Sequence, residues 1–465
     1  MPVSLGLAPP LFAAPRSGRP TRTPTPRPER PEVADRRCLD LESGRRLRSR
    51  VAGIFLFLPL LARLRFDQLI TQAGSPGTAM IPAARAVLSL LALKLLDKER
   101  RSHISDFNCD EGLGLFAGLN VLPKTAFATE YSYRTQRAHQ QRLLAGWIAA
   151  LAPQLFPDGR CFALDFHAIP FRGDASALDT HYLPRRGKAG PSLLCFFAQE
   201  QDSRVVCSAN ATLTRADQPG ELMRFVEFWH EVTGHDPRWL YFDSKVVPYP
   251  ELSRINQRGI HFVTIRRRGA AVIRRLRALP SQAWQHAVID TPRRRHQQIR
   301  FVDEQVRLPG YEGSIRQLAV EGLGREQPTL FLSNNLAETA RALVIRYAGR
   351  NGVEDGLGSS VNFFHLDCLA SEVRLNVDLD ATLTVLGHDC YRWLARGLKG
   401  FDRCAPKQVY RKCVETAGEV EIQEGRIVVR LDRRSHNPIL REAALDHQCP
   451  PVPWLNNLPI TFNYT

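Results

Sequence analysis

Three side chains that can bind phosphate or help hold a metal share a helical spacing in the segment "YAGRNGVE". Tyr347, Arg350 and Glu354 stand three and four residues apart, which places them on one face of a helix. A glutamate and an arginine at this spacing also form ordinary solvent-exposed ion pairs, which stabilise a helix by about 0.2–0.5 kcal/mol. The spacing alone leaves both interpretations open.

Two aspartates stand where predicted strands end. Asp165 follows the apolar run "CFAL", and Asp243 follows "LYF". A carboxylate that closes an apolar strand is costly to bury unless it is paired or binds a cation. Either aspartate taken singly is equally typical of a strand terminus or a helix cap, so their interpretation depends on whether the fold brings them together.

The segments around these aspartates predict the elements that would position them. Short apolar runs in "RCFALDFHAIPF", "PSLLCFFAQEQ" and "RVVCSANATLT" favour an antiparallel meander. The amphipathic helix "PGELMRFVEFWHEVTG", the strand "RWLYFDSK", the helix "PELSRINQRG" and the strand "IHFVTIRRR" follow. Three strands, helix, strand, helix, strand is the order of a ribonuclease-H-like core. Its first and fourth strands are adjacent, so Asp165, Asp243 and Glu354 are expected to converge.

These motifs resemble the insertion-sequence transposases with a DDE catalytic triad, in the branch with a β-strand insertion between the second Asp and the Glu. The matching stretches are "LDFHAIPFRG", "YFDSK", "GIHFVTIRRRG" and "TLFLSNN" leading to "IRYAGRNGVE". The segments "LNVDLDATLTVL" and "RRSHNPIL" also look like this family. The resemblance therefore covers about residues 50–445.

The resemblance implies a two-metal phosphoryl transferase. Asp165, Asp243 and Glu354 would hold two Mg²⁺ ions, with Mn²⁺ able to substitute, because phosphodiester cleavage needs carboxylates to clamp the ions. Arg350 would contact a phosphate oxygen, and Tyr347 would pack or hydrogen-bond against the DNA strand. His167, two residues after Asp165, is interpreted as an ordinary strand-end histidine and is left out of the site.

One position departs from the family pattern. The family carries a lysine seven residues after the glutamate, where this chain has Val361. Lys245 is a candidate substitute, and loss of activity is the other interpretation. Glycines at 349, 352, 356 and 358 lower the helix propensity around Glu354, so we expect its helix to bend or to begin late.

The charge of the chain favours a polyanionic partner. Lys and Arg number 63 against 47 Asp and Glu, a formal charge of +16, which attracts nucleic acid over long range; a basic surface that serves only solubility is the alternative. The arginines crowd into "RRRGAAVIRRLR" and "TPRRRHQQIR". We expect this β-rich insertion to lie along the DNA backbone, with Arg266, Arg267 and Arg268 as contacts.

The first part of the chain has two regions. Residues 1–50 are rich in Pro and Arg and predict a disordered tail, whose arginines either touch DNA or remain solvated. Residues 51–155 have a helical pattern. Within them, a Gly/Asn turn and a second helix from near Pro123, with Lys124, Arg134 and Arg137, resemble a helix-turn-helix, although many helical bundles contain such a turn.

The predicted fold class is α/β: a ribonuclease-H-like core with a β-rich insertion, preceded by an all-helical N-terminal domain. The expected divisions are a tail (1–50), a helical DNA-binding domain (51–155), the first part of the core (156–268), the basic insertion (269–327), the second part of the core (328–402) and a C-terminal region (403–465).

Cysteine usage and hydropathy point to a cytoplasmic protein, and the resemblance to transposases implies that it is associated with the nucleoid. The ten cysteines form no CxxC pair and no zinc-like cluster, and we interpret them as reduced thiols. The apolar stretch "VAGIFLFLPLLA" is too short to span a bilayer, and the prolines near the start do not suit a signal peptide. No membrane partner is expected.

Three functions remain in competition. The first is an active transposase that cuts double-stranded DNA at the inverted-repeat ends of its own insertion sequence and joins the 3′ ends to target DNA, as a homodimer on DNA. The second is a catalytically inactive, transposase-derived DNA-binding protein, which Val361 favours. A structure-selective nuclease on the same core is the third, and it would need neither the helical domain nor the basic insertion.

Overall fold

The computed structural model describes residues 39–157, 159–171, 178–183, 186–243, 247–291, 294–368 and 373–464, and residues 36–465 form one compact unit. The class is mixed α/β, as predicted. Most of the predicted N-terminal tail lies outside the described residues.

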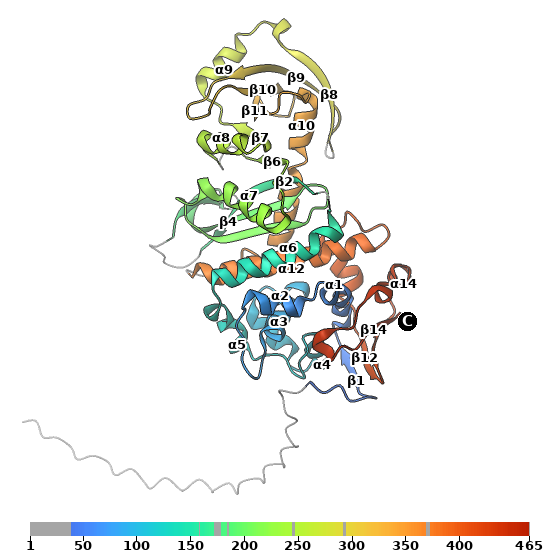
Figure 1. The fold of residues 1–465 in the computed structure, drawn as a ribbon. Helices are drawn as coiled ribbons and strands as arrows, with labels where there is room; N and C mark the ends of the chain where they lie inside the picture. The colour runs from blue at the N-terminus through green and yellow to red at the C-terminus, as the bar shows by residue number, and fades with distance from the viewer. Residues whose placement is uncertain are drawn as a thin grey trace, which may run out of the picture. The chain divides into compact units, whose positions relative to one another are not determined.

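The strands around the two aspartates form the predicted meander and its continuation (Figure 1). β2 (Cys161–Pro170), β4 (Lys188–Glu200) and β5 (Val206–Leu213) are antiparallel neighbours. β6 (Trp239–Phe242) and β7 (His261–Arg266) then add in parallel on the other side of β2. The order β5-β4-β2-β6-β7 thus makes the first and fourth strands of the core adjacent. That this core is ribonuclease-H-like stays a prediction.

Helices follow the predicted alternation. α7 (Glu221–Thr233) ends at Gly234, whose φ of +78° suits a residue without Cβ. α8 (Tyr249–Gln257) connects β6 to β7. These crossovers allow β2, β6 and β7 to be parallel, so the carboxyl ends of the three strands meet at one edge of the sheet.

The strands of the predicted insertion extend the same sheet. β11 (Thr329–Ser333) pairs with β7, and β10 (Ile315–Glu321), β9 (Arg294–Val306) and β8 (Gln285–Thr291) continue outward in antiparallel order; β3 (Thr180–Leu183) pairs with β4 at the other end. The arginine-rich start of this region, where we expected strands, is a helix, α9 (Ala270–Arg277). Its buried Ile273 and Leu276 lie three residues apart, so their helical spacing decides the local structure.

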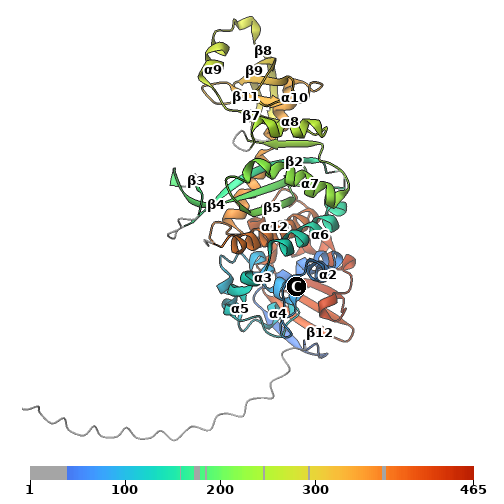
Figure 2. The same cartoon turned by 60° about the vertical axis from the view of Figure 1, so that its left-hand side comes forward.

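The segment that carries Glu354 is two helices instead of one. α10 (Ala340–Ala348) ends before Gly349, and α11 (Asn351–Asn362) begins after Arg350. Glu354 therefore lies in the first turn of α11, in keeping with the expectation that glycines would make its helix begin late. α12 (Arg374–Gly397) follows and packs against β5 and α6 (Arg137–Leu155), as Figures 1 and 2 show.

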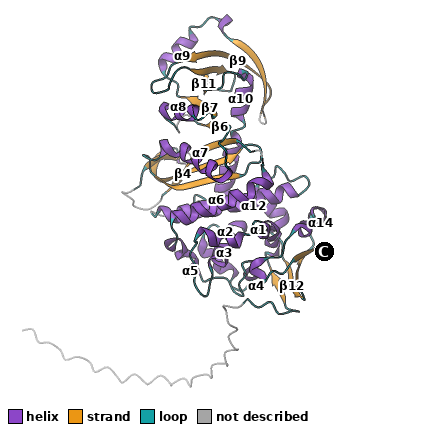
Figure 3. Ribbon diagram, in the orientation of Figure 1, coloured by secondary structure: helices purple, strands orange, loops and turns teal. Residues whose placement is uncertain are grey.

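The chain from 51 to 155 is helical (Figure 3), but its core is not separate. One buried cluster runs from Leu47 through α3, α6 and β4 to α12 and Tyr464. The helices other than α6 in this part are α1 (Leu58–Arg63), α2 (Phe66–Ala73), α3 (Ala83–Leu95), α4 (Glu111–Phe116) and α5 (Thr125–Glu130). Its status as a distinct domain stays a prediction.

A second sheet has the strand order β1-β12-β13-β14, and three of its four strands come from the C-terminal part of the chain. A hairpin is formed by β12 (Gly418–Gln423) and β13 (Arg426–Leu431), with Gly425 at a φ of +74° in its turn. β14 (Ile460–Tyr464) pairs with β13, and β1 (Arg46–Ser49) pairs with β12. The predicted tail is thus shorter than expected, because the alternately buried Leu47 and Ser49 fit the edge of this sheet. α13 (Pro406–Val409) and α14 (Asn437–Ala443) flank it in sequence.

Two of the residues predicted to read DNA in a helix-turn-helix are engaged elsewhere. The predicted second helix is divided into the short α5, a turn and α6. Arg137 donates to both carboxylate oxygens of the fully buried Asp378, each at 2.6 Å. Arg134 lies over the ring of Phe127, 5.4 Å from its centroid. Arg137 is therefore a structural residue that ties α6 to α12.

In the described parts of the chain, no helix is both long enough and apolar enough to cross a membrane. None of the nine cysteines described there forms a disulfide.

Candidate active site

The register between β2 and β6 makes Asp165 and Asp243 neighbours. Leu164 pairs with Phe242 across these parallel strands, and the two aspartates are the next residue on each strand. Adjacent strands are about 4.8 Å apart, so Asp165 and Asp243 are neighbours at the point where β6 ends. The expectation that Asp165 closes its strand is wrong, because β2 continues to Pro170 through its pairing with β4. The pairing of the two strand backbones is enough to bring Asp165 and Asp243 next to each other.

Arg350 joins Glu354 to this pair. Its Nη1 donates to Oδ2 of Asp165 at 3.1 Å, and its Nη2 donates to Oε1 of Glu354 at 2.7 Å. The Arg350 side chain is 10% exposed, whereas that of Glu354 is 44% exposed. The helical ion pair considered from sequence is therefore present, but it belongs to a larger cluster that also contains Asp165.

The charged groups of the cluster shift one another's pKa values. Burial raises the pKa of Asp165, the Arg350 charge opposes this, and Asp243 adds a smaller rise. Burial lowers the pKa of Arg350, but Tyr347 and the three carboxylates raise it to well above its ordinary value. The Arg350 guanidinium is thus close to all three acidic residues.

The ring of Tyr347 lies next to the Arg350 guanidinium. Its ring packs edge-on against Phe331, with centroids 5.2 Å apart, and the Arg350 guanidinium carbon lies 5.6 Å from its centroid. Burial raises the pKa of the Tyr347 hydroxyl. In this arrangement Tyr347 packs between Phe331 and Arg350. Its predicted contact with a DNA strand stays a prediction.

A cavity of about 690 Å³ opens beside Asp165 and Glu354. His167 also lines it, and its Nε2 lies 2.6 Å from Oδ1 of Asp367. The sequence interpretation does not include His167 in the site, although strand alternation places it on the same face as Asp165. Asp367 follows α11 in a loop, and its sequence context gave no signal.

Val361 lies on the cavity side of α11. It lines the same cavity as Glu354, seven residues earlier on the helix, and it is 8% exposed. A lysine at this position would extend into the cavity, so the departure from the family pattern removes a cation from the site itself. Arg186 also lines the cavity. Lys245, the proposed substitute, lies outside the described residues.

Glycines let α11 approach the sheet closely. A Cβ at Gly356 would lie 2.7 Å from Nε2 of Gln199 on β4, and one at Gly349 would collide with Gln201. Two of the four glycines that lower helix propensity, Gly349 and Gly356, therefore lie against glutamine side chains that a Cβ would displace.

The predicted DNA-contacting arginines emerge near the same edge of the sheet. Phe242 pairs with Thr264, so Arg266, Arg267 and Arg268 come shortly after the level of Asp243. Arg266 donates to Oε1 of Gln317 at 2.6 Å, while Arg267 and Arg268 are exposed. Arg267 and Arg268 do not make this hydrogen bond to Gln317.

The carboxylates match a hard divalent cation in donor chemistry, and Arg350 now engages two of them. Within the described ranges, no three His, Cys, Asp or Glu side chains are grouped closely enough to hold a metal ion. The donor set fits Mg²⁺, while the cluster in its present geometry is neutralised in part by the guanidinium. The metal assignment stays a prediction.

No protein-family model matches the chain, and no curated protein matches it in sequence. Among solved structures, the chain is similar to a piggyBac transposase, in a cryo-EM structure of its synaptic complex with hairpin DNA. The identity is 12%, the match covers 80% of this chain and 82% of the other, and the TM-score is 0.40. A likeness this distant carries no conclusion about the fold or the function of this chain.

Proposed function

We propose that this chain is a DNA transposase with a DDE triad on a ribonuclease-H-like core, which cuts DNA at the ends of its own insertion sequence and joins the 3′ ends to target DNA. The observation that carries the proposal is the arrangement of three acidic residues from distant segments: Asp165 and Asp243 come directly after paired residues of two parallel strands, and Arg350 joins Glu354 to Asp165. The strand order β5-β4-β2-β6-β7 supports it.

In this proposal Asp165, Asp243 and Glu354 hold two Mg²⁺ ions, or Mn²⁺ in their place. Asp165 is next to Asp243 through strand pairing and is linked to Glu354 through Arg350, so it would contribute its carboxylate to the same site as both. Divalent cations held there would supply Lewis-acid stabilisation of charge on the phosphoryl oxygens. Arg350 holds an oxygen of Asp165 and an oxygen of Glu354, so it competes with any cation for those two groups.

The remaining residues would bind and orient DNA. Arg267 and Arg268 are exposed close to the edge that carries Asp243 and would contact backbone phosphates, which fix position without reading sequence. Once released from a carboxylate, Arg350 would be available for a phosphate oxygen. We further propose that the protein acts as a homodimer on double-stranded DNA, in the cytoplasm at the nucleoid.

The second candidate is a DNA-binding protein of transposase descent that no longer cuts. Val361 favours it, because an apolar side chain occupies the cavity wall where the family has a lysine. The bridging of two carboxylates by Arg350 is compatible with it as well. The two candidates differ in whether the cluster binds a divalent cation.

Manganese binding separates them without any cleavage assay. By isothermal titration calorimetry we expect Glu354→Gln to weaken Mn²⁺ binding by about tenfold or more, because one carboxylate ligand is lost. Arg350→Gln should tighten binding, because the competing guanidinium is gone. Asp355→Asn, one residue further along α11 and with the same change of charge, is the control and should match the wild type. Equal Mn²⁺ affinity in all four proteins would contradict the metal site.

A further inference from the structure

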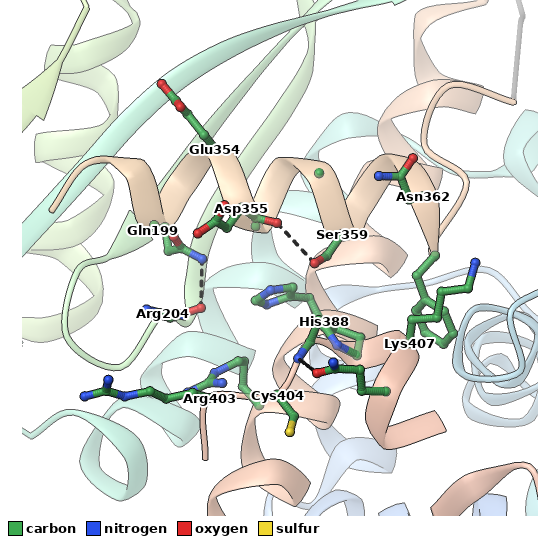
Figure 4. Close-up of a pocket in the computed structure, with 18 residues that line it drawn as sticks. Gln199, Arg204, Glu354, Asp355, Ser359, Asn362, His388, Arg403, Cys404 and Lys407 are labelled. Carbon is green, nitrogen blue, oxygen red and sulfur yellow. Dashed lines mark hydrogen bonds between the residues drawn. The ribbon is translucent and has the colours of Figure 1, made fainter. Parts of the chain in front are cut away.

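A second cavity, of about 530 Å³, lies on the other side of α11 from the carboxylates. Figure 4 shows Glu354 pointing away from it, while Asp355 and Ser359 lie on the side of α11 that faces Arg403 and Cys404. Four cationic side chains line this basic cavity, against two carboxylates, Glu354 and Asp355. The cations are Arg204, Arg392, Arg403 and Lys407.

Most of this positive charge is not neutralised internally. Within the described part of the chain, the side chains of Arg204, Arg403 and Lys407 have no ion pair. Arg392 is 6% exposed, donates to the backbone oxygens of Ser203 and Asp402, at 3.2 and 2.8 Å, and lies 3.9 Å from the Asp402 carboxylate. The four cations still outnumber the two carboxylates of the lining, and an excess of positive charge in a cleft attracts anions.

A buried histidine at this cavity has only a long contact with a carboxylate. His388 on α12 is 3% exposed and lines the cavity. Its Nδ1 makes no hydrogen bond to any described residue, and Oδ1 of Asp389 lies 3.6 Å away, beyond hydrogen-bonding distance. A buried polar atom without a hydrogen bond is uncommon. The proximity of Nδ1 to the Asp389 carboxylate means that this atom does not itself indicate an anion.

The basic cavity and the carboxylate cavity meet over α11. Glu354 and Gly358 line both of them. A Cβ at Gly358 would meet nothing within 4 Å, so the surface between the two cavities is open at this point. An extended chain of negative charges can therefore pass from one cavity to the other without displacing a side chain at position 358.

We propose that the basic cavity binds backbone phosphates of the same DNA strand whose scissile phosphate lies at Asp165, Asp243 and Glu354, and that the strand crosses α11 at Gly358. This inference rests on the proposed function and extends it, because it assigns a path to the strand beyond the point of cleavage. A strand of linked phosphates fits both cavities at once, whereas a free phosphate ion would occupy only one.

The salt dependence of DNA binding tests the phosphate contacts. We expect the double variant Arg403→Ala/Lys407→Ala to reduce the slope of log K against log salt by about 1 for each cation removed. Arg433→Ala, an exposed arginine remote from the cavity in sequence, is the control for charge alone and should change the slope less. A slope in the double variant no different from that of Arg433→Ala would overturn the inference.

Two further outcomes are distinguishable. If the wild type binds no DNA, the proposed function fails. If DNA binding by the double variant is normal and inorganic phosphate binds saturably in a Lys407-dependent manner, the cavity is a free-anion site and the inference fails while the proposed function stands.

The crossing point has its own test. Gly358→Phe should weaken strand binding and cleavage by about tenfold or more relative to Gly358→Ala, because the ring would block the path and a single methyl group would not. Equal activities of the two variants, both folded by circular dichroism, would contradict the path.

Discussion

Asp165→Asn will lower metal-dependent cleavage of DNA by on the order of 10³-fold or more, while DNA affinity stays within about twofold of the wild type. Asp165 neighbours Asp243 through strand pairing and Glu354 through Arg350. Loss of its charge removes the shared ligand of the cluster, and several kcal/mol of transition-state stabilisation corresponds to a rate factor of this size. Cleavage of a labelled duplex in Mg²⁺ or Mn²⁺ measures the loss of activity, and a separate binding assay measures the DNA affinity.

The substitution is nearly isosteric, so misfolding is a minor concern. An amide at position 165 can still pair with the backbone N–H of Phe166, which now donates to Oδ1 of Asp165. Asp202→Asn, at an exposed position between β4 and β5, controls for the change of charge and should cut normally. Full cleavage by Asp165→Asn would remove the aspartate from the catalytic cluster.

Arg137→Met will destabilise the fold by about 3–5 kcal/mol at neutral pH. Asp378 is fully buried on α12 and accepts two 2.6 Å hydrogen bonds from Arg137. Removal of one partner of a buried ion pair leaves an uncompensated charge, which is far more costly than the pair itself. Urea denaturation, followed by circular dichroism, measures the free energy of unfolding.

The loss of stability should grow with pH. Burial raises the pKa of Asp378, and Arg137 opposes this rise, so the variant has a still higher pKa at this carboxyl. A carboxyl with a raised pKa in the folded state is most favourable when protonated, and stability is lost as the pH rises through that pKa. We therefore expect a small deficit near pH 4 and the full deficit once the pH exceeds the pKa of Asp378 in the variant.

The matched control is the double variant Arg137→Met/Asp378→Asn, which removes both buried charges. It should recover much of the stability and lose the extra pH dependence. A deficit below about 1 kcal/mol at neutral pH, or one that is constant from pH 4 to 8, would contradict a buried ion pair between α6 and α12.

Local patterns in the sequence predicted the elements that carry the candidate site. The alternating runs around Asp165 and Asp243 form the expected strands, and their adjacency follows from the order of elements that was read along the chain. The offset of Arg350 and Glu354 predicted their pairing correctly. These features depend on short-range periodicity, which the sequence displays directly.

Features that depend on distant segments were not predicted. Arg137 had the position of a DNA-reading residue, and only the fold reveals Asp378, which lies 241 residues later. His167 could have been included from strand alternation, but its partner Asp367 could not. The basic cavity likewise joins residues of β4, α11, α12 and the segment around Arg403. No local pattern indicates that these segments meet.

The measurement that tests the central claim most directly is Mg²⁺- or Mn²⁺-dependent cleavage of a plasmid carrying this gene with its native flanking DNA, with wild type and Glu354→Gln compared. We predict cuts at fixed positions flanking the gene, which the variant does not make. Specific binding to those flanks with no cleavage by the wild type, in either metal, would contradict an active transposase and favour the DNA-binding descendant.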